Sequence, residues 1–150
     1  MSSTLTCIRI HFVFSTMNRK KSIDPEIRSR LWAYMGGIAR ENKMVAYAIG
    51  GTDDHAHVLL SMPPSISPSK AIQLIKGASS RWINETFPRK EKFSWQQGYS
   101  AFSLSPSKLN KTIHYIQNQE EHHLMKAFTD EHLKFLRGHS IDFDEKNVLG

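Results

Sequence analysis

Cysteine is nearly absent from this 150-residue sequence, in which Cys7 is the only one. A single cysteine excludes an intrachain disulfide framework, so the composition indicates a reducing, intracellular environment. Because Cys7 lies inside an apolar run, we expect it to be a small core residue and not a nucleophile.

Long apolar runs are missing as well. None approaches the roughly 20 residues that cross a bilayer, and the start of the chain lacks the basic stretch and apolar centre of a signal peptide. The sequence also contains no internal repeat and no low-complexity segment. We therefore expect a single cytoplasmic domain over residues 1–150, without a membrane partner.

Acidic residues are too few to balance the basic ones. The chain has 14 Asp and Glu against 20 Lys and Arg, a net charge of +6, and such a balance favours a polyanionic partner such as nucleic acid. Basic residues of two predicted loops and one aromatic residue are candidate DNA contacts: Arg19, Lys20, Lys21, Arg89, Lys90, Lys92 and Tyr99. Alternatively, these charges only keep the protein in solution.

The hydrophobic pattern switches between period 2 and period 3.6, which predicts alternating strands and helices. The predicted elements are a strand Leu5–Thr16, a helix Asp24–Asn42, a strand Met44–Ile49, a strand that begins at the histidines, a helix Ser67–Phe87 and a strand Phe93–Ser103 with a turn or bulge at Gly98. This order is typical of α+β, ferredoxin-like folds, in which an antiparallel sheet carries both helices on one face. A helix from Ser105 and a short helix over Thr129–Arg137 follow, the latter with Leu133 and Leu136 facing inward.

The third predicted strand carries two histidines. Alternation places His55 and His57 on one face and directs its apolar residues into a core: Ala56, Val58, Leu60 and Met62. The two imidazoles form a bidentate clamp for a metal ion, or they are half-exposed residues that donate to carbonyls. Asp53 and Asp54 precede them either as turn residues or as carboxylates that orient a histidine ring, and we favour the turn for both.

The helix from Ser105 carries a second pair of polar residues. Tyr115 and Gln119 are four residues apart and share a face, where they offer a phenol that can attack and a carboxamide oxygen that can bind a metal. They lie roughly 100° from the apolar stripe of this helix. On the sheet face that the first two helices leave open, the tyrosine and the histidines outline a metal-assisted nucleophilic site. A tyrosine that merely packs against a neighbour is the alternative.

Three segments, in this order, resemble the single-tyrosine HUH transposases, the small TnpA-like enzymes of bacterial insertion sequences and their REP-associated relatives. They are Asp54-His55-Ala56-His57-Val58-Leu59-Leu60, the run from Trp95 to Ser103, and Tyr115-Ile116-Gln117-Asn118-Gln119-Glu120-Glu121-His122-His123. The resemblance spans nearly the whole chain. The family has a bulky apolar residue between the two histidines, and this chain has the smaller Ala56 there.

The resemblance implies a metal-dependent tyrosine transposase. In that family the positions of His55, His57 and Gln119 bind Mg²⁺ or Mn²⁺, and the position of Tyr115 is the catalytic nucleophile. The enzymes cleave and rejoin single-stranded DNA at hairpin ends through a 5′-phosphotyrosine, usually as homodimers whose sheets merge. The same implication makes the helix from Ser105 the carrier of the catalytic tyrosine.

Two other functions remain open on the sequence. One is a catalytically silent module that binds single-stranded nucleic acid on a ferredoxin-like sheet. The other is a zinc-dependent hydrolase that uses the histidine pair and an activated water, and it would not need Tyr115.

Overall fold

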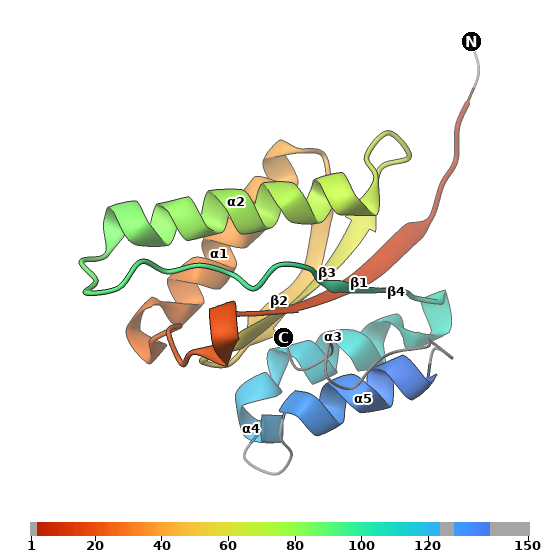
Figure 1. The fold of residues 1–150 in the computed structure, drawn as a ribbon. Coiled ribbons are helices and arrows are strands. Elements are labelled where there is room, and N and C mark those ends of the chain that lie inside the picture. Colours follow the sequence, from red (N-terminus) through yellow and green to blue (C-terminus); the bar gives the residue numbers. More distant parts are fainter. Residues whose placement is uncertain (1–2, 124–127, 139–150) are drawn as a thin grey trace.

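The fold is built on one antiparallel sheet of four strands. The structure is a computed structural model that describes residues 3–123 and 128–138. The strands stand in the order β2-β3-β1-β4, with the bounds β1 Ile8–Ser15, β2 Val45–Gly51, β3 His55–Met62 and β4 Ser100–Ser103. Strands β1 and β3 therefore form the centre of the sheet (Figure 1). This order confirms the predicted α+β, ferredoxin-like arrangement.

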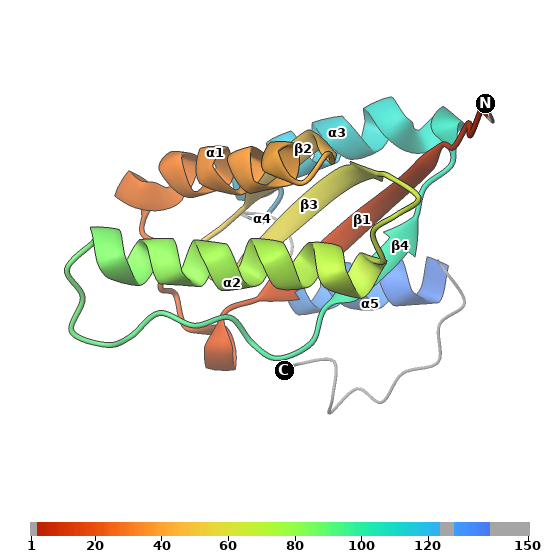
Figure 2. The same cartoon turned by 90° about the horizontal axis from the view of Figure 1, so that it is seen from above.

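Helices α1 (Pro25–Glu41) and α2 (Pro68–Thr86) cover one face of the sheet (Figures 1 and 2). Both begin with proline in the first turn, a position where the missing N–H has no helical partner to lose. The side chain of Ser67 caps α2 by accepting from the backbone N of Lys70 at 3.1 Å. The main core lies between these helices and the sheet, and it includes Phe12, Phe14, Leu31, Met35, Val58, Leu60, Ile72 and Ile75.

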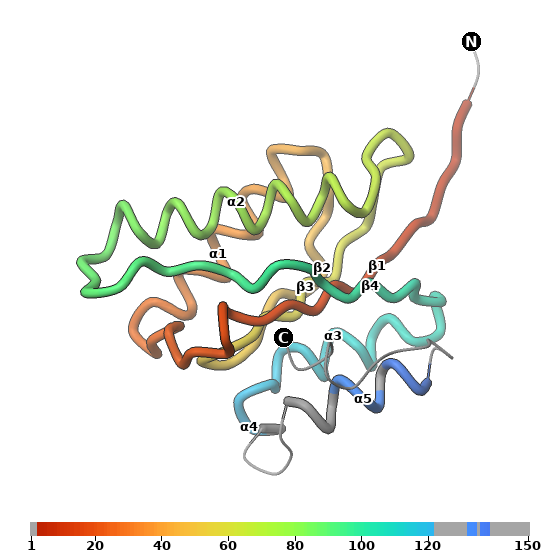
Figure 3. The backbone as a smooth tube through the Cα atoms, in the orientation of Figure 1, coloured from red at the N-terminus to blue at the C-terminus, as the bar shows by residue number. Residues whose placement is uncertain are grey.

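The opposite face of the sheet carries α3 (Leu109–Gln117), α4 (Gln119–His123) and α5 (Phe128–Gly138), which lie below it in Figure 1. The tube of Figure 3 shows the chain turning back from β4 into α3 beneath the sheet. A smaller apolar cluster joins this layer to the sheet through Ala48, Leu59 and Ile116. The helix predicted from Ser105 is interrupted at Asn118, where α3 ends. Helix α5 matches the short helix predicted over Thr129–Arg137, and its Leu136 is buried.

The predicted strand Phe93–Ser103 is wrong over most of its length, because only Ser100–Ser103 joins the sheet. Phe93 and Trp95 are instead buried in the main core, where the indole Nε1 of Trp95 donates to Ser79 Oγ of α2 at 3.0 Å. These core contacts hold the segment against α2, so it pairs with the sheet there only by the bridge from Thr16 to Trp95. Gly98, where the sequence predicts a turn or bulge, has φ +87°, a conformation that glycine adopts without strain.

The expectation that Cys7 is a core residue is also wrong, since its side chain is exposed. Pairing of β1 with β3 begins one residue later, where Ile8 lies opposite Met62. Cys7 therefore stands beyond the last rung of the ladder, where no neighbouring strand covers it.

Among the helices of residues 3–123 and 128–138, none is long and apolar enough to cross a membrane.

Candidate active site

His55 and His57 lie on the face of the sheet that α3 and α4 cover. They share this face with Leu59, which packs on Ile116 of α3, whereas Ala56 and Val58 point into the main core. Both imidazoles are buried, and their ring centroids are 5.1 Å apart at an interplanar angle of 77°. Strand alternation therefore places the two rings side by side, as the sequence predicts.

The imidazole of His55 is held through Nδ1. This atom lies 2.9 Å from Asp54 Oδ1 and 3.0 Å from Thr52 Oγ1. Burial raises the pKa of the Asp54 carboxyl, but the hydrogen bond to His55, the charges of His55 and Arg19 and the hydroxyl of Thr52 outweigh it and lower this pKa below its usual 3.8. The turn interpretation of Asp54 is therefore incomplete, because its carboxylate orients a histidine ring, as carboxylates do beside metal-binding histidines.

The imidazole of His57 is held by another histidine. His11 Nε2 of β1 lies 2.8 Å from His57 Nδ1, and both side chains are buried. Sequence reasoning placed His11 in the first strand but did not connect it to the site. The alternation of β1 was the available signal for the face on which His11 lies. The strand register sets Val13 opposite His57 and His11 opposite Leu59. Only this register brings His11 diagonally next to His57.

Tyr115 and Gln119 reach the histidines from the helical layer. Gln119 Oε1 is 3.0 Å from His55 Nε2, and Gln119 Nε2 donates to the backbone oxygen of Tyr115 at 3.3 Å. The Tyr115 ring stands edge-on to His57, with centroids 5.7 Å apart and an interplanar angle of 87°. Its hydroxyl oxygen is buried. One chain therefore assembles all four predicted residues.

The donor set fits a small divalent ion. The site brings together two imidazole rings and a carboxamide oxygen. His55 Nε2 donates its N–H to Gln119 Oε1 at 3.0 Å, because an amide oxygen only accepts, and loss of this proton would let both atoms bind one divalent ion. Among the described residues, no group of three His, Cys, Asp or Glu side chains is placed to hold a metal. A metal site here therefore depends on the amide of Gln119.

Comparison with known proteins decides the family. The family model described as IS200-like transposase matches residues 4–119. The chain belongs to the IS200-like transposase family. The match ends at Gln119 and thus includes His55, His57 and Tyr115, in agreement with the resemblance seen in the sequence. No curated protein matches the sequence significantly.

Two solved structures share the fold of this transposase. A protein of Deinococcus radiodurans R1, described as a candidate transposase, is 23% identical, with a TM-score of 0.66 over 79% of this chain and 95% of its own. A REP-associated tyrosine transposase, solved with a REP hairpin bound, is 15% identical, with a TM-score of 0.59 over 97% of this chain and 90% of its own.

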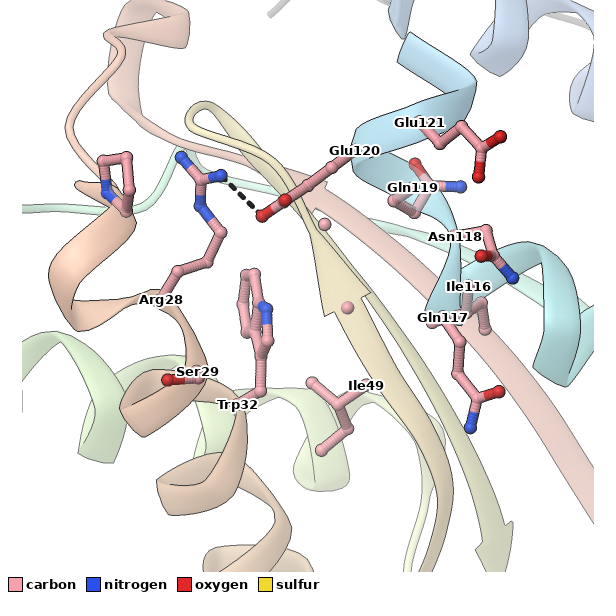
Figure 4. A pocket seen from close by; sticks show the side chains of 13 residues that line it. Arg28, Ser29, Trp32, Ile49, Ile116, Gln117, Asn118, Gln119, Glu120 and Glu121 are labelled. Carbon is pink, nitrogen blue, oxygen red and sulfur yellow. Dashed lines mark hydrogen bonds and ion pairs between the residues drawn. The ribbon is translucent and has the colours of Figure 1, made fainter. Parts of the chain in front are cut away.

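A pocket of about 520 Å³ opens beside Gln119, between α1, β2 and the junction of α3 with α4 (Figure 4). Across it, Arg28 Nη1 of α1 donates to Glu120 Oε1 of α4 at 2.6 Å. Arg28 Nη2 also donates to the backbone oxygen of Ile23 at 2.9 Å, which anchors the guanidinium to the loop before α1. The ion pair therefore ties the helix that begins with Gln119 to the main body of the transposase.

Gly50 allows α3 to approach the sheet. A Cβ built on Gly50 of β2 would collide with the backbone oxygen of Ile116, one residue after Tyr115. Because a backbone atom cannot move aside alone, we expect Gly50→Ala to lower the free energy of unfolding by about 1–3 kcal/mol, measured by urea denaturation. Gly77→Ala is the matched control, since a Cβ on this exposed glycine of α2 meets nothing within 4 Å. Equal effects of the two substitutions would contradict the close approach.

The predicted DNA contacts gather largely in two adjoining loops. Lys20 Nζ lies 2.7 Å from Glu91 Oε2, and Arg89 donates to the backbone oxygen of Ser22. Arg19 approaches Asp54 Oδ2 at 3.7 Å, next to the histidine site. The remaining basic side chains of the two loops are exposed: Lys21, Lys90 and Lys92. Tyr99 is 41% exposed and packs edge-on against Phe12, with centroids 6.0 Å apart.

Proposed function

We propose that this transposase cleaves and rejoins single-stranded DNA through Tyr115, with Mg²⁺ or Mn²⁺ held by His55, His57 and Gln119. One observation carries the proposal. The Tyr115 ring lies edge-on to His57, with 5.7 Å between ring centroids, and Gln119 Oε1 lies 3.0 Å from His55 Nε2. A nucleophile and a metal-ligand set in one buried site are what phosphoryl transfer requires.

The proposed reaction uses these groups, and the bond that breaks is the one that the resemblance to single-tyrosine HUH transposases implies. The Tyr115 Oη attacks the phosphorus of a DNA phosphodiester, and the bond from phosphorus to the 3′ oxygen breaks. The phenol proton is lost and the leaving 3′ oxygen gains a proton, so the products are a 5′-phosphotyrosine and a free 3′-hydroxyl. A divalent ion held by His55, His57 and Gln119 would supply positive charge that stabilises the reacting phosphate and favours the ionised phenol. Because the phosphotyrosine is still a diester, another 3′-hydroxyl reverses the step and joins two strands.

Neighbouring residues keep the groups in place. Asp54 and Thr52 orient the His55 ring, and the ion pair from Arg28 to Glu120 holds α4 next to it. His55, His57 and Gln119 are each at most 1% exposed, so few water molecules screen the charges of the site. Electrostatic interactions with the charge that develops in the transition state are stronger in such an environment.

The proposed substrate is single-stranded DNA with hairpin ends, of an insertion sequence or a repeat element. The REP hairpin bound by a protein of the same fold supports a hairpin substrate, and the net charge of +6 supports a polyanionic one. We further propose that the working form is a homodimer, as the resemblance implies. Within one chain the tyrosine already lies beside its own histidines.

The proposal is tested by incubating the protein with labelled single-stranded DNA from the flanks of its own gene, with Mg²⁺ or Mn²⁺, followed by denaturing electrophoresis. A labelled band that migrates with the protein, appears only with the metal and is sensitive to protease supports the tyrosine mechanism. DNA binding without an adduct would favour the catalytically silent module instead. Cleavage without an adduct would favour a hydrolase that uses activated water.

The two basic loops give a separate prediction about DNA affinity. We expect Lys90→Gln to weaken binding of single-stranded DNA and to reduce the slope of log K against log salt by about 0.7, and the triple change of Lys21, Lys90 and Lys92 to glutamine to reduce it by about 2. Lys70→Gln is the control. Lys70 lies in the first turn of α2, a helix of 19 residues and about 28 Å, and Lys90 follows the opposite end of this helix. Fluorescence anisotropy at several salt concentrations measures the slopes. An equal loss with Lys70→Gln would place the DNA elsewhere.

A further inference from the structure

We propose that His11 is a positioning residue, which accepts the Nδ1–H of His57 and thereby leaves His57 Nε2 unprotonated to bind the metal ion. The inference rests on the proposed function for the role of His57 as a ligand. The hydrogen bond itself is a property of the metal-free protein and can be examined without DNA.

The geometry couples the two rings tightly. His11 Nε2 and His57 Nδ1 are 2.8 Å apart, and the ring centroids are 5.1 Å apart with an interplanar angle of 32°. His11 is 1% exposed and His57 is 0% exposed. A hydrogen bond of this length between buried groups persists, because neither partner can exchange it for one with bulk water.

The tautomer follows from the requirement for a lone pair on the nitrogen that binds the metal. A neutral imidazole has one N–H and one lone pair. If His11 Nε2 donated to His57 Nδ1, the proton of His57 would reside on Nε2 and block that atom as a ligand. If His57 Nδ1 donates instead, its Nε2 keeps the lone pair, and the proton of His11 resides on its own Nδ1. Since the hydrogen bond at one ring nitrogen determines which nitrogen can bind a metal, only the second arrangement serves the site.

His11 is itself held firmly. It lies on a central strand and is paired on both sides, opposite Leu59 of β3 and Phe102 of β4. The Phe102 ring packs against the His11 imidazole with centroids 6.1 Å apart and an interplanar angle of 62°. Moving His11 away from His57 would therefore disturb two strand ladders. This rigidity is what a residue needs in order to orient another group.

The two proposed ligands thus receive different support. His55 has the carboxylate of Asp54 at Nδ1, whereas His57 has the imidazole of His11 there. A carboxylate orients its histidine and adds a negative charge next to the ring. An imidazole supplies the same directional acceptor without a second negative charge next to the approaching DNA phosphate.

The first test is nitrogen NMR of ¹⁵N-histidine-labelled, metal-free protein in the Tyr115→Phe background at pH 8, where ordinary histidines are neutral. Wild-type His11 should hold His57 in the Nδ1–H form. His11→Leu removes the acceptor and should shift His57 toward the Nε2–H form, while His11→Gln, whose Oε1 accepts an N–H, should restore the Nδ1–H form. A His57 that carries its proton on Nε2 while His11 is present would overturn the proposal at once.

The second test is Mn²⁺ affinity of the same proteins, measured by calorimetry. His11→Leu should weaken binding about 10- to 100-fold, the usual effect of removing a residue that orients a metal ligand, and His11→Gln should recover part of it. Circular dichroism identifies any variant that fails to fold. Equal losses in folded Leu and Gln variants would show that His11 only packs and would overturn the proposal. If the wild type binds no Mn²⁺ while the tautomer behaves as expected, the proposed metal function fails and the orientation of His57 stands.

Discussion

Tyr115→Phe should abolish the proposed covalent adduct between this transposase and DNA, an expected loss on the order of 10⁴-fold or more. The substitution removes only the phenol oxygen that we propose as the nucleophile. The ring that packs edge-on against His57 remains, so α3 keeps its place on the sheet. DNA affinity should change less than about twofold, because the phenol does not carry the electrostatic part of binding.

The measurement is the yield of protease-sensitive, labelled adduct on a denaturing gel, with DNA affinity determined in parallel. Tyr99→Phe provides the matched control, since Tyr99 is 41% exposed and packs against Phe12 and not against the histidines. That variant should form the adduct at the wild-type level. An adduct that survives in Tyr115→Phe would mean that another residue is the nucleophile.

His55→Ala should eliminate metal-dependent cleavage, with an expected reduction of about 10³-fold or more, because the lost charge stabilisation amounts to several kcal/mol and each 1.36 kcal/mol is tenfold in rate. The substitution removes the group that meets Gln119 Oε1 at 3.0 Å and Asp54 Oδ1 at 2.9 Å. It also leaves the buried Gln119 Oε1 and the partly buried Asp54 Oδ1 without this partner, which should lower stability by about 1–3 kcal/mol. Mn²⁺ titration and thermal unfolding separate the two effects.

His114→Ala is the control for this substitution. His114 is exposed and belongs to α3, directly before Tyr115. Its removal should leave Mn²⁺ affinity and adduct yield unchanged. Excess EDTA should reproduce the His55→Ala result in the wild-type protein, and added Mn²⁺ should reverse it. Full cleavage in the presence of the chelator would refute the metal requirement.

Much of the fold could be predicted because the relevant patterns are local. Alternation in β3 separates His55 and His57 from Val58 and Leu60, and the structure places the second pair in the core. The spacing of Tyr115 and Gln119 by one helical turn likewise survives, even though Asn118 interrupts the helix between them.

The errors occurred where long-range contacts compete with local preference. The aromatic segment before Gly98 has the composition of a strand, yet burial of Phe93 and Trp95 beneath α2 keeps most of it out of the sheet. Cys7 has apolar neighbours, but the ladder ends at Ile8 and leaves it exposed. The sequence favoured Asp54 as a turn residue, whereas the structure places its Oδ1 2.9 Å from Nδ1 of His55.

The sequence by itself determined which side chains share a face. Residues two apart on a strand, or four apart on a helix, point to the same side whatever the rest of the chain does. Only the tertiary structure decided which faces meet. His11 and His57 are 46 residues apart, and His55 and Gln119 are 64 apart. Their contacts depend on the register of β1 with β3 and on the approach of α3 to Gly50, which are properties of packed elements and not of any one segment.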